Sequence, residues 1–145
     1  SPHIKNNQKI STPILHAIRT YHFSLKTRSK KGDELELYKE YYPSDHKLLE
    51  EIIDFLLERG ADVNVIEYDA TKPHSDPIPV DTPLIFAVRY GYLNIVKKLL
   101  KFGADVNQRI PNRDDPFGEK ITALSLAEQL ENYKIIECLE KSVNA

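Results

Sequence analysis

The sequence predicts an all-α protein, a solenoid built from helix-turn-helix repeats, and two repeated phrases carry this prediction. The longer phrase reads LLERGADVN at Leu56–Asn64 and LLKFGADVN at Leu99–Asn107, with seven of nine residues identical. The shorter phrase begins with threonine and ends with alanine, and it occurs at Thr12–Ala17 (TPILHA), Thr82–Ala87 (TPLIFA) and Thr122–Ala127 (TALSLA). Because internal similarity at intervals of tens of residues is typical of repeat architectures, three copies of one structural unit are predicted.

The shorter phrase predicts the start of a short first helix in each unit. In the middle unit, the hydroxyl of Thr82 can accept a hydrogen bond from a free amide of the first turn, so threonine suits the N-cap. Pro83 suits the first helical position, where its missing N–H would have no partner inside the helix. We expect this helix to end near Gly91.

A second helix follows in each unit and carries aliphatic pairs at positions i, i+1, i+4 and i+5. In the middle unit these pairs are Ile95, Val96, Leu99 and Leu100. They form one broad apolar stripe, which a solenoid buries between neighbouring repeats, and this interpretation is favoured over a lipid-binding groove. Gly60 and Gly103 are predicted to end the second helix as left-handed C-caps.

These units resemble the ankyrin repeat, a unit of about 33 residues with a TPLHxA signature, a helix pair and a β-hairpin finger. The middle unit matches this pattern best. The histidine that follows TPL in the family is absent, because Leu15, Ile85 and Ser125 stand at that position. In the family this histidine helps to tie neighbouring repeats together by hydrogen bonds. The resemblance therefore implies hairpins that are less regular than usual.

The chain has 145 residues, which fits one domain. Within a single ankyrin-repeat domain over 1–145, we expect repeat 1 at about 11–66, repeat 2 at about 80–109 and repeat 3 at about 120–143. Repeat 3 is predicted to be a C-terminal cap, because a charged residue, Glu140, takes the place of an apolar one.

Repeat 1 carries an insertion at about 18–44, since 27 more residues separate its helices than in repeat 2. The first helix is expected to continue through 18–29, and Gly32 is expected to break it. The segment 34–42 places Leu37, Tyr38 and Tyr41 on one helical face, which predicts an extra helical segment. Ser44 can cap the second helix of the repeat.

Composition favours a folded protein with protein partners. The chain is 41% hydrophobic and 29% charged with a net charge of -2, so it has no general attraction to nucleic acid or to anionic membranes. No apolar run approaches the roughly 18–20 residues of a membrane span. The single cysteine, Cys138, excludes an internal disulfide and fits a cytoplasmic location. Because the chain starts at Ser1 and contains no methionine, we expect a processed chain or a fragment.

No pattern in the sequence predicts catalysis, a cofactor or a metal site. The histidines lack zinc-ligand spacing with Cys138; they are His3, His16, His22, His46 and His74. Neither a GxGxxG nor a GxxxxGK[ST] phosphate loop occurs. Cys138 is expected to be a half-buried thiol without a base beside it. The basic run at 26–32 could be a nuclear signal or a phosphate-facing patch, but the acidic residues that follow favour a solvated loop.

The predicted functional surface consists of the finger tips and the exposed end of each first helix, which ankyrin relatives use to bind partners. Extended loops often carry function, and tyrosine and arginine are enriched at interface hot spots. The alternative is that these are ordinary exposed loop residues. The candidate partner-binding residues are Tyr68, Lys72, His74, Asp81, Arg89, Tyr90, Arg109, Arg113, Phe117, Gln129 and Leu130.

The function expected from the resemblance is that of a protein-interaction module. It would bind another protein through its concave face and fingers as a monomer, without a cofactor, nucleic acid or membrane. The composition and irregular repeats also resemble ankyrin proteins of intracellular bacteria and poxviruses, which predicts an effector acting on a host protein in the host cytoplasm. Two alternatives remain open: a targeting domain of a larger enzyme whose catalytic part is absent here, and an enzyme within these residues.

Overall fold

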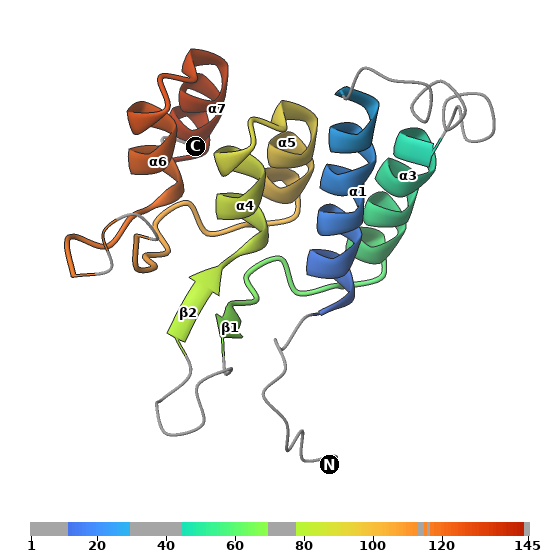
Figure 1. The fold of residues 1–145 in the computed structure, drawn as a ribbon, viewed down its shortest axis with the longest axis horizontal. Coiled ribbons are helices and arrows are strands. Elements are labelled where there is room, and N and C mark those ends of the chain that lie inside the picture. Colours follow the sequence, from blue (N-terminus) through green and yellow to red (C-terminus); the bar gives the residue numbers. More distant parts are fainter. Residues whose placement is uncertain (1–11, 30–44, 70–77, 113–114, 116, 144–145) are drawn as a thin grey trace, which may run out of the picture. The chain divides into compact units, whose positions relative to one another are not determined.

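The computed structural model describes residues 12–29, 45–69, 78–112, 115 and 117–143. Its helices and strands separate into two compact units, Pro13–Asp62 and the described residues from Val63 onward (Figure 1). The structure is mostly helical, with one short pair of strands, which confirms the predicted all-α repeat class. The repeat boundaries drawn from the sequence remain predictions.

The unit Pro13–Asp62 consists of two helices packed against each other, α1 (Pro13–Ser29) and α3 (Asp45–Glu58). The α1 helix begins directly after Thr12 and runs to Ser29, which confirms the predicted extension through 18–29. Its buried side chains are Ile14, Leu15, Ala17, Ile18, Tyr21 and His22. Burial, and to a lesser extent the charge of Glu50, raises the pKa of Tyr21. The predicted helical segment 34–42 and the cap Ser44 lie outside the described residues.

The second unit contains two helix pairs that stack side by side. The first pair is α4 (Pro83–Arg89) with α5 (Leu93–Lys101), and the second is α6 (Ala123–Gln129) with α7 (Tyr133–Val143). Helix α4 contacts α6, and α5 contacts α7 (Figure 1). The inner members of the aliphatic pairs are fully buried, namely Ile95, Leu99, Ile135 and Leu139. Burial of this stripe confirms that it is core.

Two strand pairings precede the helix pairs of this unit. Strands β1 (Glu67–Asp69) and β2 (Ile78–Asp81) are antiparallel, with Glu67 opposite Asp81 and an irregular register between Glu67 and Tyr68. Before α6, a single bridge joins Ile110 and Ile121, whose amides and carbonyls exchange hydrogen bonds of 3.0 and 2.8 Å. Each pairing therefore fixes the position of the backbone directly before a first helix, α4 or α6.

Threonine caps the first helix of both pairs from Val63 onward, α4 and α6, as predicted. The Thr82 hydroxyl accepts a hydrogen bond of 3.1 Å from the amide of Ile85. The Thr122 hydroxyl accepts one of 3.1 Å from the amide of Ser125, and the Ser125 hydroxyl accepts one of 2.9 Å from the Thr122 amide. This reciprocal capping box satisfies two amides that the helix itself cannot pair. Ser125 thus has a local role at the position of the family's histidine.

Four helices, α3, α4, α5 and α6, end in left-handed turns. Gly60 and Gly103 have φ angles of +89° and +90°, which confirms the predicted C-caps. Gly91, between α4 and α5, has φ +73°, whereas the matching residue between α6 and α7 is Glu131 with φ +55°. In all four turns the two amides after the helix bond back to carbonyls of its last turn, the pattern of a Schellman motif.

Asn64 links the two copies of the GADVN phrase. Its side-chain amide donates to the carbonyl of Gly103 at 3.3 Å, and its side-chain oxygen accepts from the amide of Asp105 at 2.7 Å. The last residue of the first copy therefore holds the backbone of the second copy in its turn. This contact gives a structural reason for the presence of the GADVN sequence in two successive repeats.

Candidate interaction surface

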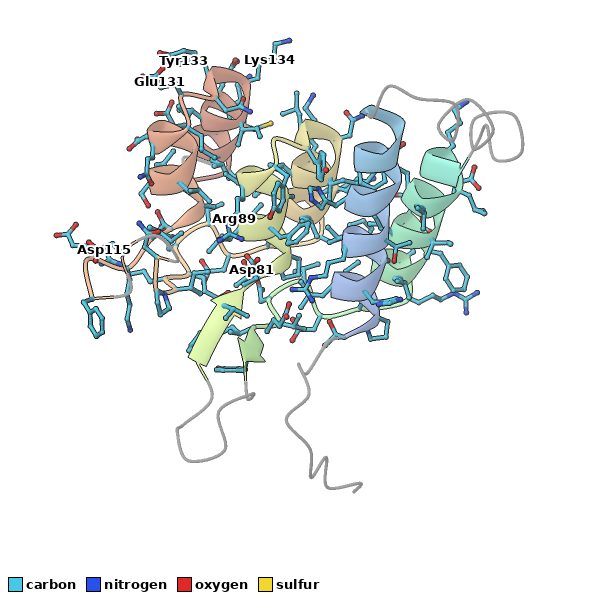
Figure 2. The ribbon with its side chains drawn as sticks, viewed as in Figure 1. Asp81, Arg89, Asp115, Glu131, Tyr133 and Lys134 are labelled. Atoms are coloured by element: carbon cyan, nitrogen blue, oxygen red, sulfur yellow. The ribbon has the colours of Figure 1, made fainter. Side chains whose placement is uncertain are left out.

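Asp81 and Arg89, both predicted to contact a partner, bind each other (Figure 2). Nη1 of Arg89 donates to Oδ2 of Asp81 at 2.6 Å, with the Asp81 side chain fully buried and that of Arg89 16% exposed. Arg89 is the last residue of α4, and its long side chain reaches back along this short helix to the end of β2. The pair therefore fastens strand to helix, and we leave it out of the candidate surface.

Glu67 adds a second buried carboxylate to this region. It lies opposite Asp81 in the strand pairing, and neither residue is accessible to solvent. Residues directly opposite in an antiparallel pair bring their side chains to one face of the sheet. Carboxylates this deeply buried need compensation by hydrogen bonds or by a cation, and Arg89 supplies a cation here.

The turns at the C-terminal ends of α4 and α6 expose large side chains. Tyr90 is 37% exposed, Leu130 is 48% exposed, and Gln129 is exposed as well. The ring of Tyr90 packs at 4.9 Å from the ring of Phe86, which limits its freedom before any partner arrives. The candidate residues Tyr90, Gln129 and Leu130 thus share one end of the helix pairs.

Tyr133, the first residue of α7, belongs to the same end of the molecule and is 73% exposed. The sequence pattern does not point to Tyr133, because the matching residue of the middle repeat, Leu93, is an ordinary half-buried aliphatic side chain. Replacement of that aliphatic by an exposed tyrosine was the available signal. We name Tyr90, Leu130, Glu131 and Tyr133 the turn surface.

The finger candidates lie at the opposite end of the helices. Arg109 is exposed, Phe117 is fully exposed, and Tyr68 is half-buried in β1. Figure 2 shows Asp115, near Phe117 in the chain, far from Glu131 and Tyr133. The seven residues of α4 separate the two ends by about 10 Å. The candidates Lys72, His74 and Arg113 lie outside the described residues.

Cys138 is half-buried on α7, as expected, and is discussed below as part of a groove. In the described ranges, no three histidine, cysteine or acidic side chains are grouped so that they could hold a metal ion. None of the described helices combines the length and the apolar character needed to cross a membrane.

Comparison with known proteins bears directly on the middle helix pair. The family model of the ankyrin repeat matches residues 81–110, which include Asp81, α4, α5 and the GADVN turn. Residues 81–110 therefore form an ankyrin repeat. Ankyrin repeats generally mediate protein–protein interaction, and domains built from them are typically not catalytic.

Two relatives match part of this chain. Ankyrin repeat protein FPV031 of fowlpox virus (strain NVSL) is 37% identical over 92 residues, which cover 63% of this chain and 23% of the viral protein. Serine/threonine-protein kinase VIK of Arabidopsis thaliana is 34% identical over 76 residues, which cover 52% of this chain and 16% of the kinase. The chain therefore spans less than a quarter of the length of either relative.

Proposed function

We propose that this ankyrin-repeat chain binds a partner protein chiefly through the turn surface formed by Tyr90, Leu130, Glu131 and Tyr133. The observation that carries the proposal is the exposure of three large side chains, Tyr90, Leu130 and Tyr133, at one end of two stacked helix pairs. Exposed apolar side chains that gather in one place are typical of interaction sites, and tyrosine is enriched at interface hot spots.

The backbone at Glu131 supports the same surface. Glu131 occupies the left-handed region, where the matching turn has Gly91. A side chain in this region costs free energy, and such costs cluster at functional sites. Figure 2 shows Glu131 at the same end of the α6/α7 pair as Tyr133, so the turn surface joins apolar contact area to a carboxylate that can fix the orientation of a partner.

The fingers form a second, weaker part of the proposed contact. Phe117 offers a fully exposed ring and Arg109 an exposed guanidinium. They lie beyond the N-terminal ends of the first helices, so the length of α4, about 10 Å, is only part of their separation from the turn surface, and a partner of standard interface size, about 800 Å² per side, would reach both ends only as an extended contact. We expect both ends to contribute, with the larger share from the turn surface because more apolar side chains gather there.

The test compares capture of partners by the wild-type chain and by three variants that circular dichroism shows to be folded. The turn variant is Tyr90→Ala/Leu130→Ala/Tyr133→Ala, and the finger variant is Arg109→Ala/Phe117→Ala. The control variant, Leu48→Ala/Phe55→Ala, removes exposed apolar side chains from α3. We expect a partner that is lost with the turn variant, weakened with the finger variant and kept with the control. A partner that survives the turn variant would contradict the proposed surface.

The proposed architecture behind this surface is a stack of three repeats, at about 11–66, 80–109 and 120–143, with finger loops before the second and third. The strand pair β1/β2 and the Ile110–Ile121 bridge support the fingers. We further propose an effector that acts on a host protein in the host cytoplasm. The fowlpox virus relative supports this role, and detection of the chain inside infected host cells would test it.

A second candidate function is that of a targeting domain within a larger enzyme. The observation that favours it is the match to part of a serine/threonine-protein kinase, of which the shared region is 16%. Such a domain would bring a catalytic domain to its substrate without taking part in the reaction. Sequencing the complete transcript discriminates between the two, because a reading frame that encodes a catalytic domain favours targeting and a frame of about this size excludes it.

A further inference from the structure

A groove runs between α5 and α7, the second helices of the two stacked pairs, and the proposed partner surface does not account for it. It has a volume of about 380 Å³ and is lined by Leu93, Lys97, Lys134, Glu137, Cys138 and Lys141. On α7 the lining residues recur at intervals of three and four, which places them on one face of the helix. Leu93 and Lys97 are four residues apart on α5 and face the same groove.

The charge of the groove is opposite in sign to that of the chain. Three lysines and one glutamate line it, which gives a local charge of +2, whereas the whole chain carries -2. Nζ of Lys141 lies 2.9 Å from Oε1 of Glu137, so this pair largely neutralises itself. The hydrogen bond between Lys141 and Glu137 lowers the pKa of the glutamate and raises the pKa of the lysine. The glutamate is thus already engaged.

Lys97 and Lys134 are the two remaining cations of the groove, and the charge of Lys97 also contributes to lowering the pKa of Glu137. Both are exposed, and no carboxylate in the described part of the chain forms a salt bridge with either. They stand on different helices on opposite sides of the groove, so a ligand held by both must lie between α5 and α7. Leu93 and the aliphatic stems of the lysines supply apolar contact along its walls.

We infer that this groove binds an acidic peptide segment of a protein, with Lys97 and Lys134 contacting its carboxylates. Charge complementarity selects the sign of the ligand. The small local charge and the negative net charge of the chain disfavour a nucleic acid, whose binding depends on neutralising many phosphates. None of the four turn-surface residues lines the groove, so it is a site additional to the turn surface.

Cys138 makes the inference directly testable, because it lines the groove and is the chain's only cysteine. Alkylation by a neutral reagent such as iodoacetamide therefore reports on the groove alone. The probe is a blocked poly-glutamate peptide at low ionic strength, and a poly-glutamine peptide of the same length is its neutral control. We expect poly-glutamate to slow alkylation of the folded chain several-fold and poly-glutamine to have no effect. Added salt should abolish the protection.

Two charge-matched variants locate the site. Lys97→Gln/Lys134→Gln removes the two cations of the groove, and Lys47→Gln/Lys120→Gln removes two exposed lysines elsewhere. Anisotropy of a labelled poly-glutamate peptide should show binding weakened about five- to tenfold by the groove variant and almost unchanged by the control, as expected for two solvent-accessible charge contacts.

Three results would overturn the inference. In the first, poly-glutamate binds without protecting Cys138. In the second, both variants lose affinity equally, which would indicate attraction to the general surface. In the third, a single-stranded oligonucleotide of similar charge protects Cys138 better than the peptide, which would assign the groove to nucleic acid. Because the turn variant Tyr90→Ala/Leu130→Ala/Tyr133→Ala keeps every lysine of the groove, failure of the turn surface would leave this test intact.

Discussion

The helix pairs α4/α5 and α6/α7 share one backbone plan and differ in the chemistry that supports it. Each first helix starts at a threonine cap, Thr82 or Thr122, and each second helix buries aliphatic residues completely, three in α5 and two in α7. Each pair is joined by a Schellman turn, with a glycine in one and Glu131 in the other. The difference therefore lies in side chains placed on a common frame.

The strand pairing before α4 has a charged base. Glu67 and Asp81 face each other, and Arg89 binds Asp81 from the end of α4. A buried carboxylate loses its hydration, so it depends on the cation beside it. The base of this finger is thus held by a contact that fails if one partner is removed.

The matching base before α6 is apolar. Ile110 stands 43 residues after Glu67, and Ile121 stands 40 residues after Asp81, the same offsets that separate the GADVN and threonine phrases. Both isoleucines are buried, and Gln129, which matches Arg89, is exposed. The two bases show that one backbone position accepts either an ion pair or an aliphatic pair. A buried ion pair is often no more stabilising than apolar residues of similar volume.

The largest expected effect comes from removing the cation at the charged base. Arg89→Gln copies the residue of the other pair but removes the cation beside the buried carboxylate of Asp81. We expect the free energy of unfolding to fall by about 3–5 kcal/mol, the cost of breaking a buried ion pair. Urea titration followed by circular dichroism measures the change.

The matched control replaces all three residues of the charged base with the residues at the matching positions before and on α6. In Glu67→Ile/Asp81→Ile/Arg89→Gln both buried carboxylates are replaced together with the cation, and most of the lost stability should return. A triple variant as unstable as Arg89→Gln would mean that the first finger needs its charges for more than local compensation. The comparison between the two bases would then fail.

Signals local in sequence made the helix ends predictable. Thr82, Gly60 and Gly103 act through hydrogen bonds to residues no more than five positions away, so a short phrase contains both partners. The aliphatic stripe was equally readable, because its period follows from helix geometry. These local features were sufficient to predict the repeat and its core from the sequence.

The charged base could not be read from the sequence in the same way. Fourteen positions separate Glu67 from Asp81, and an irregular register between Glu67 and Tyr68 decides which residues face each other. Sequence reasoning therefore treated Asp81 and Arg89 as surface residues. The exposure of Tyr133 and the groove of Lys97 and Lys134 likewise depend on how α5 and α7 pack, which no single segment specifies.

The next effect concerns the GADVN turns, where one copy holds the other. Asn64→Ala removes two hydrogen bonds, to Gly103 and Asp105, and should lower the free energy of unfolding by about 1–2 kcal/mol. Asn107→Ala is the control, since the third repeat contains no GADVN sequence that Asn107 could hold in the same way. Urea titration of both variants should show a clear loss only for Asn64→Ala; equal losses would contradict a linking role.

The smallest effect tests the turns between the helices. Gly91→Ala places a side chain at φ +73° and should destabilise the chain by about 1 kcal/mol, mainly through backbone strain, because the added Cβ would meet only the Asn132 amide at an ordinary 3.5 Å. Glu131→Gly relieves the same strain in the other pair, which is worth about 1–2 kcal/mol. The greater freedom of glycine in the unfolded state offsets part of this gain, so the net stabilisation should be about 0.5–1 kcal/mol. Thermal unfolding of both variants measures these opposite shifts.

The variant Glu131→Gly also connects stability with binding. If it raises the melting temperature and weakens partner capture, then Glu131 is retained at the cost of stability because its carboxylate serves the turn surface. If it raises the melting temperature and leaves capture unchanged, Glu131 has no part in the interface, and Tyr90, Leu130 and Tyr133 carry it alone. A lower melting temperature would mean that the Glu131 side chain stabilises α6/α7, and the two turns would then differ in mechanism as the two finger bases do.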